Sequence, residues 1–86
     1  MKYRATQEHP FFDRFNNLIT SAVSVNHKSI SEIAREIGIR RNTLHNYRNR
    51  KLLPSAETLI KIADYFGVST DYLLGREGYE MEETNA

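Results

Sequence analysis

Residues 30–49 read ISEIAREIGIRRNTLHNYRN and carry the most informative structural pattern in the 86-residue chain. Its first half carries apolar residues at the spacing of one helix face, at Ile30, Ile33, Ala34 and Ile37. Ser29 and Glu32 form the pattern of a capping box, in which the hydroxyl and the carboxylate each satisfy a backbone donor of the first turn. Gly38 predicts the end of this helix, because glycine adopts the positive φ of a C-terminal cap without steric cost.

A second short helix is expected directly after the first, over residues 41–48. Its apolar residues Leu44 and Tyr47 stand three apart, which predicts a buried face. The small side chain of Ala34 allows the two helices to cross closely. Two helices joined by a turn of three or four residues form a helix-turn-helix, and the stretch predicts this motif.

Residues 30–49 are similar to the helix-turn-helix of the phage repressor and Cro family, the group with lambda-repressor-like DNA-binding domains. Residues 59–75, LIKIADYFGVSTDYLLG, resemble the fourth and fifth helices of the same family almost residue for residue. The resemblance covers about residues 10–75. It implies an all-α fold, a compact five-helix lambda-repressor-like bundle with the helix-turn-helix at helices 2 and 3, and an XRE-type transcriptional regulator that binds DNA.

The remaining sequence predicts three further helices and two tails. The first helix is expected over about residues 10–25, with a buried face of Phe11, Phe15, Leu18, Ile19 and Ala22. Ser55 caps a fourth helix that ends at Gly67, with a buried face of Ala56, Leu59, Ile60, Ala63 and Phe66. Ser69 caps a short fifth helix that ends at Gly75. The expected organisation is a flexible N-terminal arm over 1–9, a helix-turn-helix domain over 10–75, and an acidic flexible tail or linker over 76–86.

The composition excludes several classes of protein. The chain has no cysteine, so neither a disulfide nor a thiolate–zinc site is expected, and the three histidines are too far apart in sequence to suggest a metal site. No cofactor motif, phosphate-binding glycine loop, nucleophile elbow or HExxH is present, so we do not expect an enzyme. The first residues lack the apolar segment of a signal peptide, and no stretch would span a membrane. We expect a soluble protein in the cytoplasm of a bacterium or a phage-infected host cell.

The net charge of +1 conceals two halves of opposite sign. Residues 1–53 hold ten Lys/Arg against four Asp/Glu, a balance of +6, and residues 54–86 hold two against seven, a balance of −5. Residues 40–51 contain five basic residues, three asparagines, one histidine and no acid. Because a DNA-binding protein needs positive charge only where it faces phosphates, this basic block indicates a DNA contact at the second motif helix.

The exposed face of that helix carries the residues suited to reading DNA. A helix fits the major groove, where each base pair presents its own pattern of donors and acceptors. Once the apolar residues point inward, the outward side chains are Arg41, Asn42, His45 and Asn46. Arginine pairs with guanine and asparagine with adenine, so we predict that Arg41 and Asn42 read bases. The resemblance makes Asn46 a further base-reading position, and His45 beside it is left open between a base, a phosphate and neither.

Phosphate contacts are expected on both sides of the reading helix, because they fix its register on the duplex without carrying sequence information. The candidates just before the helix, on it and in the loop after it are Arg40, Thr43, Arg48, Asn49, Arg50 and Lys51. The resemblance adds the start of the preceding helix, where Ser29 and Ser31 supply hydroxyl or amide contacts. Lys2 and Arg4 on the N-terminal arm are candidates for an adjacent minor groove.

Three places depart from the family pattern. Ile30 replaces a glutamine that contacts phosphate, so that contact is not expected here. Arg40 replaces the serine or threonine that caps the reading helix, which puts a cation at the positive end of the helix dipole. Residues 48–50, Arg-Asn-Arg, replace the usual acidic-Asn-Gly, whose carboxylate often pairs with an arginine of the first helix. That helix is read as aliphatic and neutral at this place, so Arg48 is expected to be free to face DNA.

These observations predict a sequence-specific transcriptional regulator that binds double-stranded DNA. The expected protein is a repressor of the phage CI/Cro type that reads a palindromic operator as a homodimer. The dimer seam is expected on the fifth helix at Val68, Tyr72 and Leu73, although the same residues are equally suited to completing the core. The alternative is a protein-interaction module, such as an antitoxin-like regulator whose principal partner is another protein.

Overall fold

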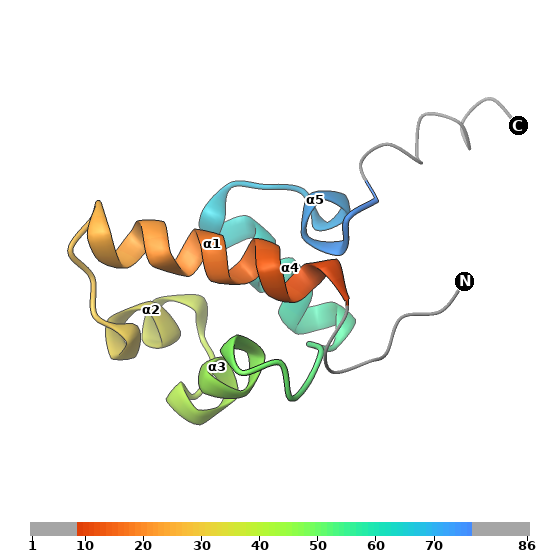
Figure 1. Ribbon diagram of the computed structural model, residues 1–86. Helices are drawn as coiled ribbons and strands as arrows, with labels where there is room; N and C mark the ends of the chain where they lie inside the picture. The colour runs from red at the N-terminus through yellow and green to blue at the C-terminus, as the bar shows by residue number, and fades with distance from the viewer. Residues whose placement is uncertain (1–8, 77–86) are drawn as a thin grey trace, which may run out of the picture.

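The structure, a computed structural model, describes residues 9–76 (Figure 1). These residues form five helices, α1 (Pro10–Ser24), α2 (Ile30–Ile37), α3 (Arg41–Arg48), α4 (Ala56–Phe66) and α5 (Thr70–Leu74). No strand occurs among them, so the prediction of an all-α five-helix bundle is confirmed. α1 runs across the domain and packs against α2, α3 and α5. Each described helix is too short or too polar to cross a bilayer.

The predicted helix ends of the helix-turn-helix are present. The Ser29 hydroxyl accepts a hydrogen bond from the Glu32 amide at 3.1 Å, and the Glu32 carboxylate accepts one from the Ser29 amide at 2.9 Å. These two bonds complete the capping box at the start of α2. At the other end Gly38 has φ +97°, and the Ile39 amide donates to the Ala34 carbonyl at 2.9 Å. The chain can therefore leave α2 and begin α3 within three residues.

The N-terminal cap of α1 was not expected from the sequence. His9 stands before Pro10, and its Nδ1 accepts a hydrogen bond from the Phe11 amide at 3.0 Å. Partial burial lowers the pKa of His9, which favours the neutral imidazole that this acceptor role needs. Pro10 follows at the first helical position, where its missing amide hydrogen is no loss.

The core joins all five helices through aliphatic and aromatic side chains. The Phe11 and Phe15 rings stack with centroids 5.2 Å apart, and Tyr47 meets both rings edge-on at 6.1 and 5.9 Å. This aromatic contact fixes α3 against α1. The buried apolar residues are Phe11, Phe12, Phe15, Ile19, Ala22, Ile33, Ala34, Ile37, Leu44, Tyr47, Leu59, Ile62, Ala63 and Leu73.

Two parts of the predicted core are wrong. On α4, Ile60 is 53% exposed and Ala56 is also exposed, whereas Ile62 is fully buried in their place. The helix carries two overlapping apolar stripes, and packing against α2 and α5 selects the one that contains Leu59, Ile62 and Ala63. Two further predicted core residues, Leu18 of α1 and Phe66 of α4, are only half-buried and pack against the core. Phe12 of α1, which was not predicted, is buried in it.

Of the candidates for the dimer seam, Leu73 takes the alternative role of completing the core, where its side chain is completely buried. Val68 and Tyr72 are half-buried and pack against that core. The Arg14 guanidinium lies 4.5 Å from the centre of the Tyr72 ring and donates to the Tyr72 carbonyl at 3.1 Å. α5 therefore serves first to close the core over α1, beside which it lies in Figure 1.

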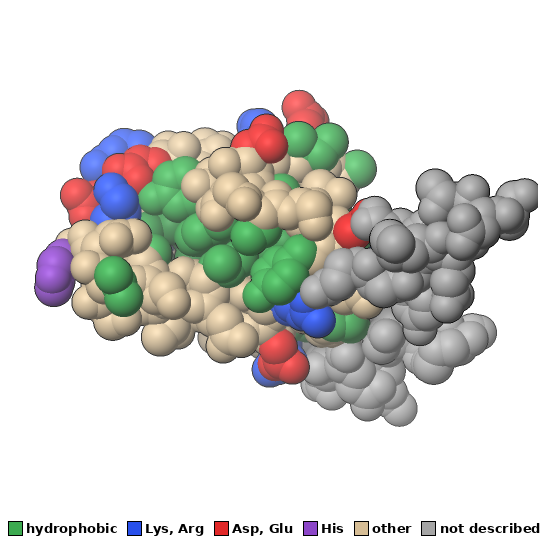
Figure 2. All heavy atoms as spheres, turned by 90° about the horizontal axis from the view of Figure 1, so that it is seen from above, with side chains coloured by type: hydrophobic (Ala, Val, Ile, Leu, Met, Phe, Trp, Pro, Cys, Tyr) green, Lys and Arg blue, Asp and Glu red, His purple; other side chains and the backbone are tan. Residues whose placement is uncertain are grey.

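Apolar side chains also gather on the face seen in Figure 2, with charged side chains toward its margins. This face is viewed from above Figure 1, where the α4–α5 connection lies, whereas α3 lies on the lower side of the domain. The half-buried apolar residues of α1, α4 and α5 include Leu18, Tyr65, Phe66, Tyr72 and Leu74. The face on which apolar side chains gather and the helix α3 thus lie on different sides of the molecule.

Candidate nucleic-acid interface

Two buried side chains hold α3 to the domain, and its other side chains are exposed or half-buried. Leu44 is fully buried and Tyr47 nearly so, which confirms the predicted inner face of the helix. On the outer face Arg41, Asn42 and His45 are exposed, and Asn46 is half-exposed. None of the four predicted base-reading residues is buried beneath another segment. The structure brings them together on one short helix at the edge of the domain (Figure 1).

The start of α3 lacks a side-chain cap. Arg40 occupies the capping position with extended backbone angles, and its side chain makes no cap hydrogen bond to the helix. Its guanidinium is exposed, and Arg41 is the first helical residue after it. Two cations therefore flank backbone amides that the helix itself leaves unpaired, an arrangement that favours an anion at this end.

The loop after α3 is closed by backbone hydrogen bonds. The Lys51 amide donates to the Asn46 carbonyl at 2.9 Å and the Arg50 amide donates to the Tyr47 carbonyl at 3.3 Å. The backbone of Arg50 has φ +63°, in the left-handed region that glycine occupies most easily. The exposed side chains of this loop include Asn49 and Lys51, both predicted phosphate ligands.

Arg50 does not extend freely from this loop. Its Nη2 lies 2.5 Å from the Asp13 Oδ1 of α1, and its guanidinium lies 5.9 Å from the centre of the Phe12 ring. This acidic partner on α1 was not predicted from the sequence, whereas the α1 residue that contacts Arg48 is the neutral Asn16. A charged pair joins the two elements, with the acid on α1 and the arginine in the loop. The sequence signal was Asp13, an acid in the first turn of α1.

Arg48 also contacts α1. Its side chain is half-buried, and its Nε is enclosed without a hydrogen-bond partner. The Arg48 carbonyl accepts a hydrogen bond from the Asn16 Nδ2 at 3.2 Å, while the Asn16 Oδ1 is likewise buried and unpaired. Arg48 was predicted to be free to face DNA, but the domain partly encloses its side chain.

The remaining predicted contacts lie in different settings. Ser29 and Ser31 are exposed at the start of α2, but the Ser29 hydroxyl already accepts the capping hydrogen bond. Thr43 is half-buried on α3. Lys2 and Arg4, the predicted minor-groove residues, lie outside the described residues, as does most of the predicted acidic tail, residues 77–86.

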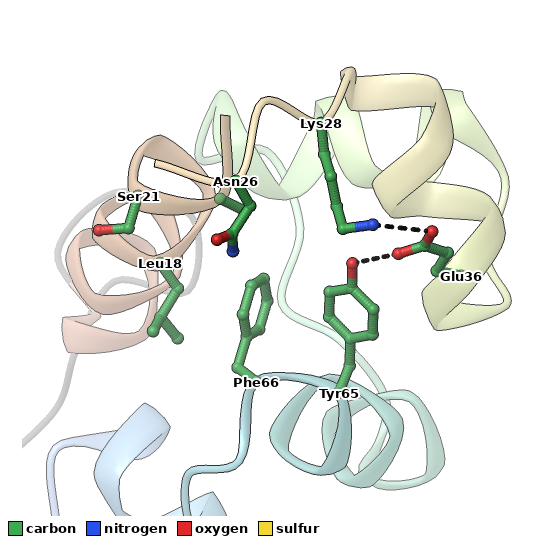
Figure 3. A pocket seen from close by; sticks show the side chains of 8 residues that line it. Leu18, Ser21, Asn26, Lys28, Glu36, Tyr65 and Phe66 are labelled. Carbon is green, nitrogen blue, oxygen red and sulfur yellow. Dashed lines mark hydrogen bonds and ion pairs between the residues drawn. The ribbon is translucent and has the colours of Figure 1, made fainter. Parts of the chain in front are cut away.

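A pocket of about 380 Å³ lies away from α3, between α1, the α1–α2 turn, α2 and α4 (Figure 3). Glu36 accepts hydrogen bonds there from the Tyr65 hydroxyl at 2.5 Å and from the Lys28 ammonium at 3.1 Å. These two bonds lower the pKa of Glu36. Burial and the hydrogen bond to Glu36 raise the pKa of Tyr65 to about 12. The lining residues are Leu18, Ser21, Ala22, Asn26, Lys28, Glu36, Tyr65 and Phe66.

Comparison with known proteins identifies the domain. The profile of a family described as a helix-turn-helix domain matches residues 18–78. The HTH-type transcriptional regulator ImmR of Bacillus subtilis (strain 168) is 41% identical over 46 residues, which are 54% of this chain and 36% of that regulator. The chain thus spans about a third of this relative's length.

A solved structure agrees with the fold. The solution structure of the SOS-response transcriptional repressor LexA of Eubacterium rectale superposes with a TM-score of 0.68 at 25% identity. The match covers 76% of this chain and 65% of that one.

Proposed function

Because this chain belongs to the helix-turn-helix domain family, we propose that it binds double-stranded DNA sequence-specifically, with α3 in the major groove. The family is one of DNA-binding transcriptional regulators and not of enzymes. The observation that carries the proposal is the outer face of α3, where arginine and asparagine side chains are exposed and no acid occurs from residue 40 to residue 51.

We assign base reading to this face. Arg41 and Asn42 are exposed in the first turn of α3, the part of a recognition helix that contacts base edges. A guanidinium can donate two hydrogen bonds to guanine, and a carboxamide can donate and accept one each with adenine. Asn46 lies one turn further along the same face, and His45 beside it supplies a further donor to a base or a phosphate.

Phosphate binding is assigned to both ends of α3. Arg40 and Lys51 are exposed cations before and after the helix, and Asn49 and Thr43 are polar residues that can donate to phosphate oxygens. Ser29 and Ser31 at the start of α2 extend this set through their hydroxyl groups, because the Ser29 amide already donates to the Glu32 carboxylate. Contacts on both sides of a recognition helix hold it in one register on the duplex.

We further propose that the protein is a repressor of the phage CI/Cro type that binds a palindromic operator as a homodimer. A single small domain buries too little DNA for strong specificity, and two copies related by a two-fold axis read two half-sites. The solved LexA structure is that of a transcriptional repressor. The proposed members of the seam are Val68, half-buried in the connection before α5, and Tyr72, half-buried on α5.

Selection of bound sequences from random duplexes tests this proposal. The full chain should enrich one motif, with two inverted half-sites about one helical turn apart if the homodimer is correct. Asn42→Ala should relax the preference at one base pair of each half-site, whereas Lys61→Ala, which removes an exposed cation from α4, should leave the motif unchanged. Failure of the chain to enrich any motif would contradict sequence-specific binding.

A further inference from the structure

We propose that Asp13 is a positioning residue for DNA reading: with Asn16 it ties the end of α3 to α1 and so sets the direction of the recognition helix. The proposal rests on DNA binding by α3. It assigns to Arg50 a role inside the domain, in place of the phosphate contact that its charge and position in the loop suggest.

The geometry consists of two contacts from one face of α1. Asp13 and Asn16 stand three residues apart on α1 and therefore lie on the same side of the helix. Asp13 pairs with the Arg50 guanidinium, and Asn16 donates to the Arg48 carbonyl. Both partners lie at the end of α3 or just beyond it. We call these four residues the α1–α3 link.

The backbone of Arg50 supports this assignment. A residue with a Cβ is strained at φ +63°, and a glycine there would close the same loop without that strain. The arginine side chain, however, makes contacts that glycine cannot make, to the Asp13 carboxylate and to the face of the Phe12 ring. A residue that is unfavourable for the turn is thus held in place by its contacts with α1.

Apolar contacts hold one face of α3, and the Tyr47 ring packs against Phe11 and Phe15 of α1. Leu44 and Tyr47 anchor one face of the helix. Contacts on a single face still allow α3 to rotate about the line that joins these two side chains. The link adds polar contacts beyond Tyr47, at the C-terminal end. Specific binding requires that the side chains of α3 meet base edges at one angle, whereas non-specific binding requires only positive charge near phosphate. The link should therefore matter for specificity more than for general affinity.

The experiment compares the full chain with Asp13→Asn on the selected operator and on a random duplex, over a range of salt concentrations. Asp13→Asn should weaken operator binding by roughly two- to fivefold, the scale of an exposed ion pair, and leave random-duplex binding equal or slightly tighter. The slope of affinity against salt should not change, because no phosphate contact is lost or gained. Asp64→Asn is the matched control, since it removes one exposed carboxylate from α4, and it should leave the ratio of the two affinities unchanged.

Exchange of the two charges separates positioning from phosphate binding. The double variant Asp13→Arg, Arg50→Asp should restore the ratio of operator to random-duplex affinity, whereas Arg50→Asp alone should lower it. If Asp13→Asn tightens binding to both duplexes and steepens the salt slope, Arg50 is a phosphate ligand restrained by Asp13, and the proposal is overturned. An unchanged ratio in Asp13→Asn overturns it as well. A chain that selects no operator contradicts the proposed function instead, a result visible before any variant is made.

Discussion

The Tyr65 hydroxyl donates a hydrogen bond to the Glu36 carboxylate across 2.5 Å and thereby joins α4 to α2 (Figure 3). Lys28 from the α1–α2 turn reaches the other oxygen of the same carboxylate. α2 is the helix that supports α3, and this contact secures its C-terminal turn while the capping box secures its start. The support of the proposed reading helix thus depends partly on polar contacts on a side of the domain away from α3.

This contact predicts a dependence of stability on pH at both extremes. The pKa of Glu36 is lowered in the folded state, so its contribution is present above its ordinary value of 4.5 and is lost as the pH falls through the lowered value. The pKa of Tyr65 is raised to about 12, so its contribution is present below its ordinary value of 10.0 and is lost as the pH rises toward 12. Tyr65→Phe should make the free energy of unfolding, measured with urea, less dependent on pH in both the acidic and the alkaline range. Equal pH profiles for the two proteins would show that the hydrogen bond contributes nothing.

Ser29→Ala should lower the free energy of unfolding by about 1 kcal/mol, because it removes the acceptor for the Glu32 amide at the start of α2. Ser31→Ala is the matched control, an exposed serine within the first turn of the same helix. Chemical denaturation of both variants measures the difference. A loss of equal size at Ser31 would mean that the capping box does not explain the effect.

Ile62→Ala should destabilise the domain by about 2–4 kcal/mol, because Ile62 is fully buried and its truncation leaves a cavity. Ile60→Ala, two residues away on the same helix, should change the unfolding free energy by no more than about 0.5 kcal/mol because its side chain is largely in solvent. Thermal and urea unfolding of the pair test which stripe of α4 faces the core. The reverse order of the two effects would restore the buried face expected from the sequence.

Gly75→Ala should destabilise the contact between the end of α5 and the start of α1. A Cβ at this position would lie 2.8 Å from the Cβ and Cγ of Pro10, and the backbone there has φ +74°. Gly38→Ala is the comparison, because φ is also positive there but no atom lies within 4 Å of the added Cβ. Gly75→Ala should therefore lower the midpoint of thermal unfolding more than Gly38→Ala. If the two losses are equal, the approach of Pro10 carries no additional cost.

Lys51→Ala and Arg41→Ala should weaken DNA binding in different ways. Lys51→Ala should reduce affinity for every duplex and lower the salt slope by about one, as expected for one lost phosphate contact. Arg41→Ala should cost about 1–3 kcal/mol on the selected operator and reduce discrimination at one base pair. Titrations on the operator and on single-base variants distinguish the two patterns. Uniform weakening by Arg41→Ala would move that residue to the phosphate set.

The helix-turn-helix and the helix ends could be predicted because they depend on residues close together in the chain. The capping box needs only Ser29 and Glu32, three residues apart, and the end of α2 needs only a glycine at residue 38. The spacing of apolar residues over eight positions was sufficient to predict that Leu44 and Tyr47 face the core. It thereby identified the exposed face of α3. Such features follow from hydrogen bonds and steric preferences within one or two turns of a helix.

Contacts between distant residues were decided by the way the helices cross. Asp13 and Arg50 are separated by 37 positions, and no local pattern indicates that the first turn of α1 meets the loop after α3. The choice between Ile60 and Ile62, and the burial of Leu73, likewise depended on which neighbour each helix face meets. The approximate ends of the helices and the polar side of α3 could be predicted from the amino-acid sequence alone, because those properties are local. Which cations near α3 contact α1 depends on the packing of the helices, because an ion pair requires a short distance between two elements that the core brings together.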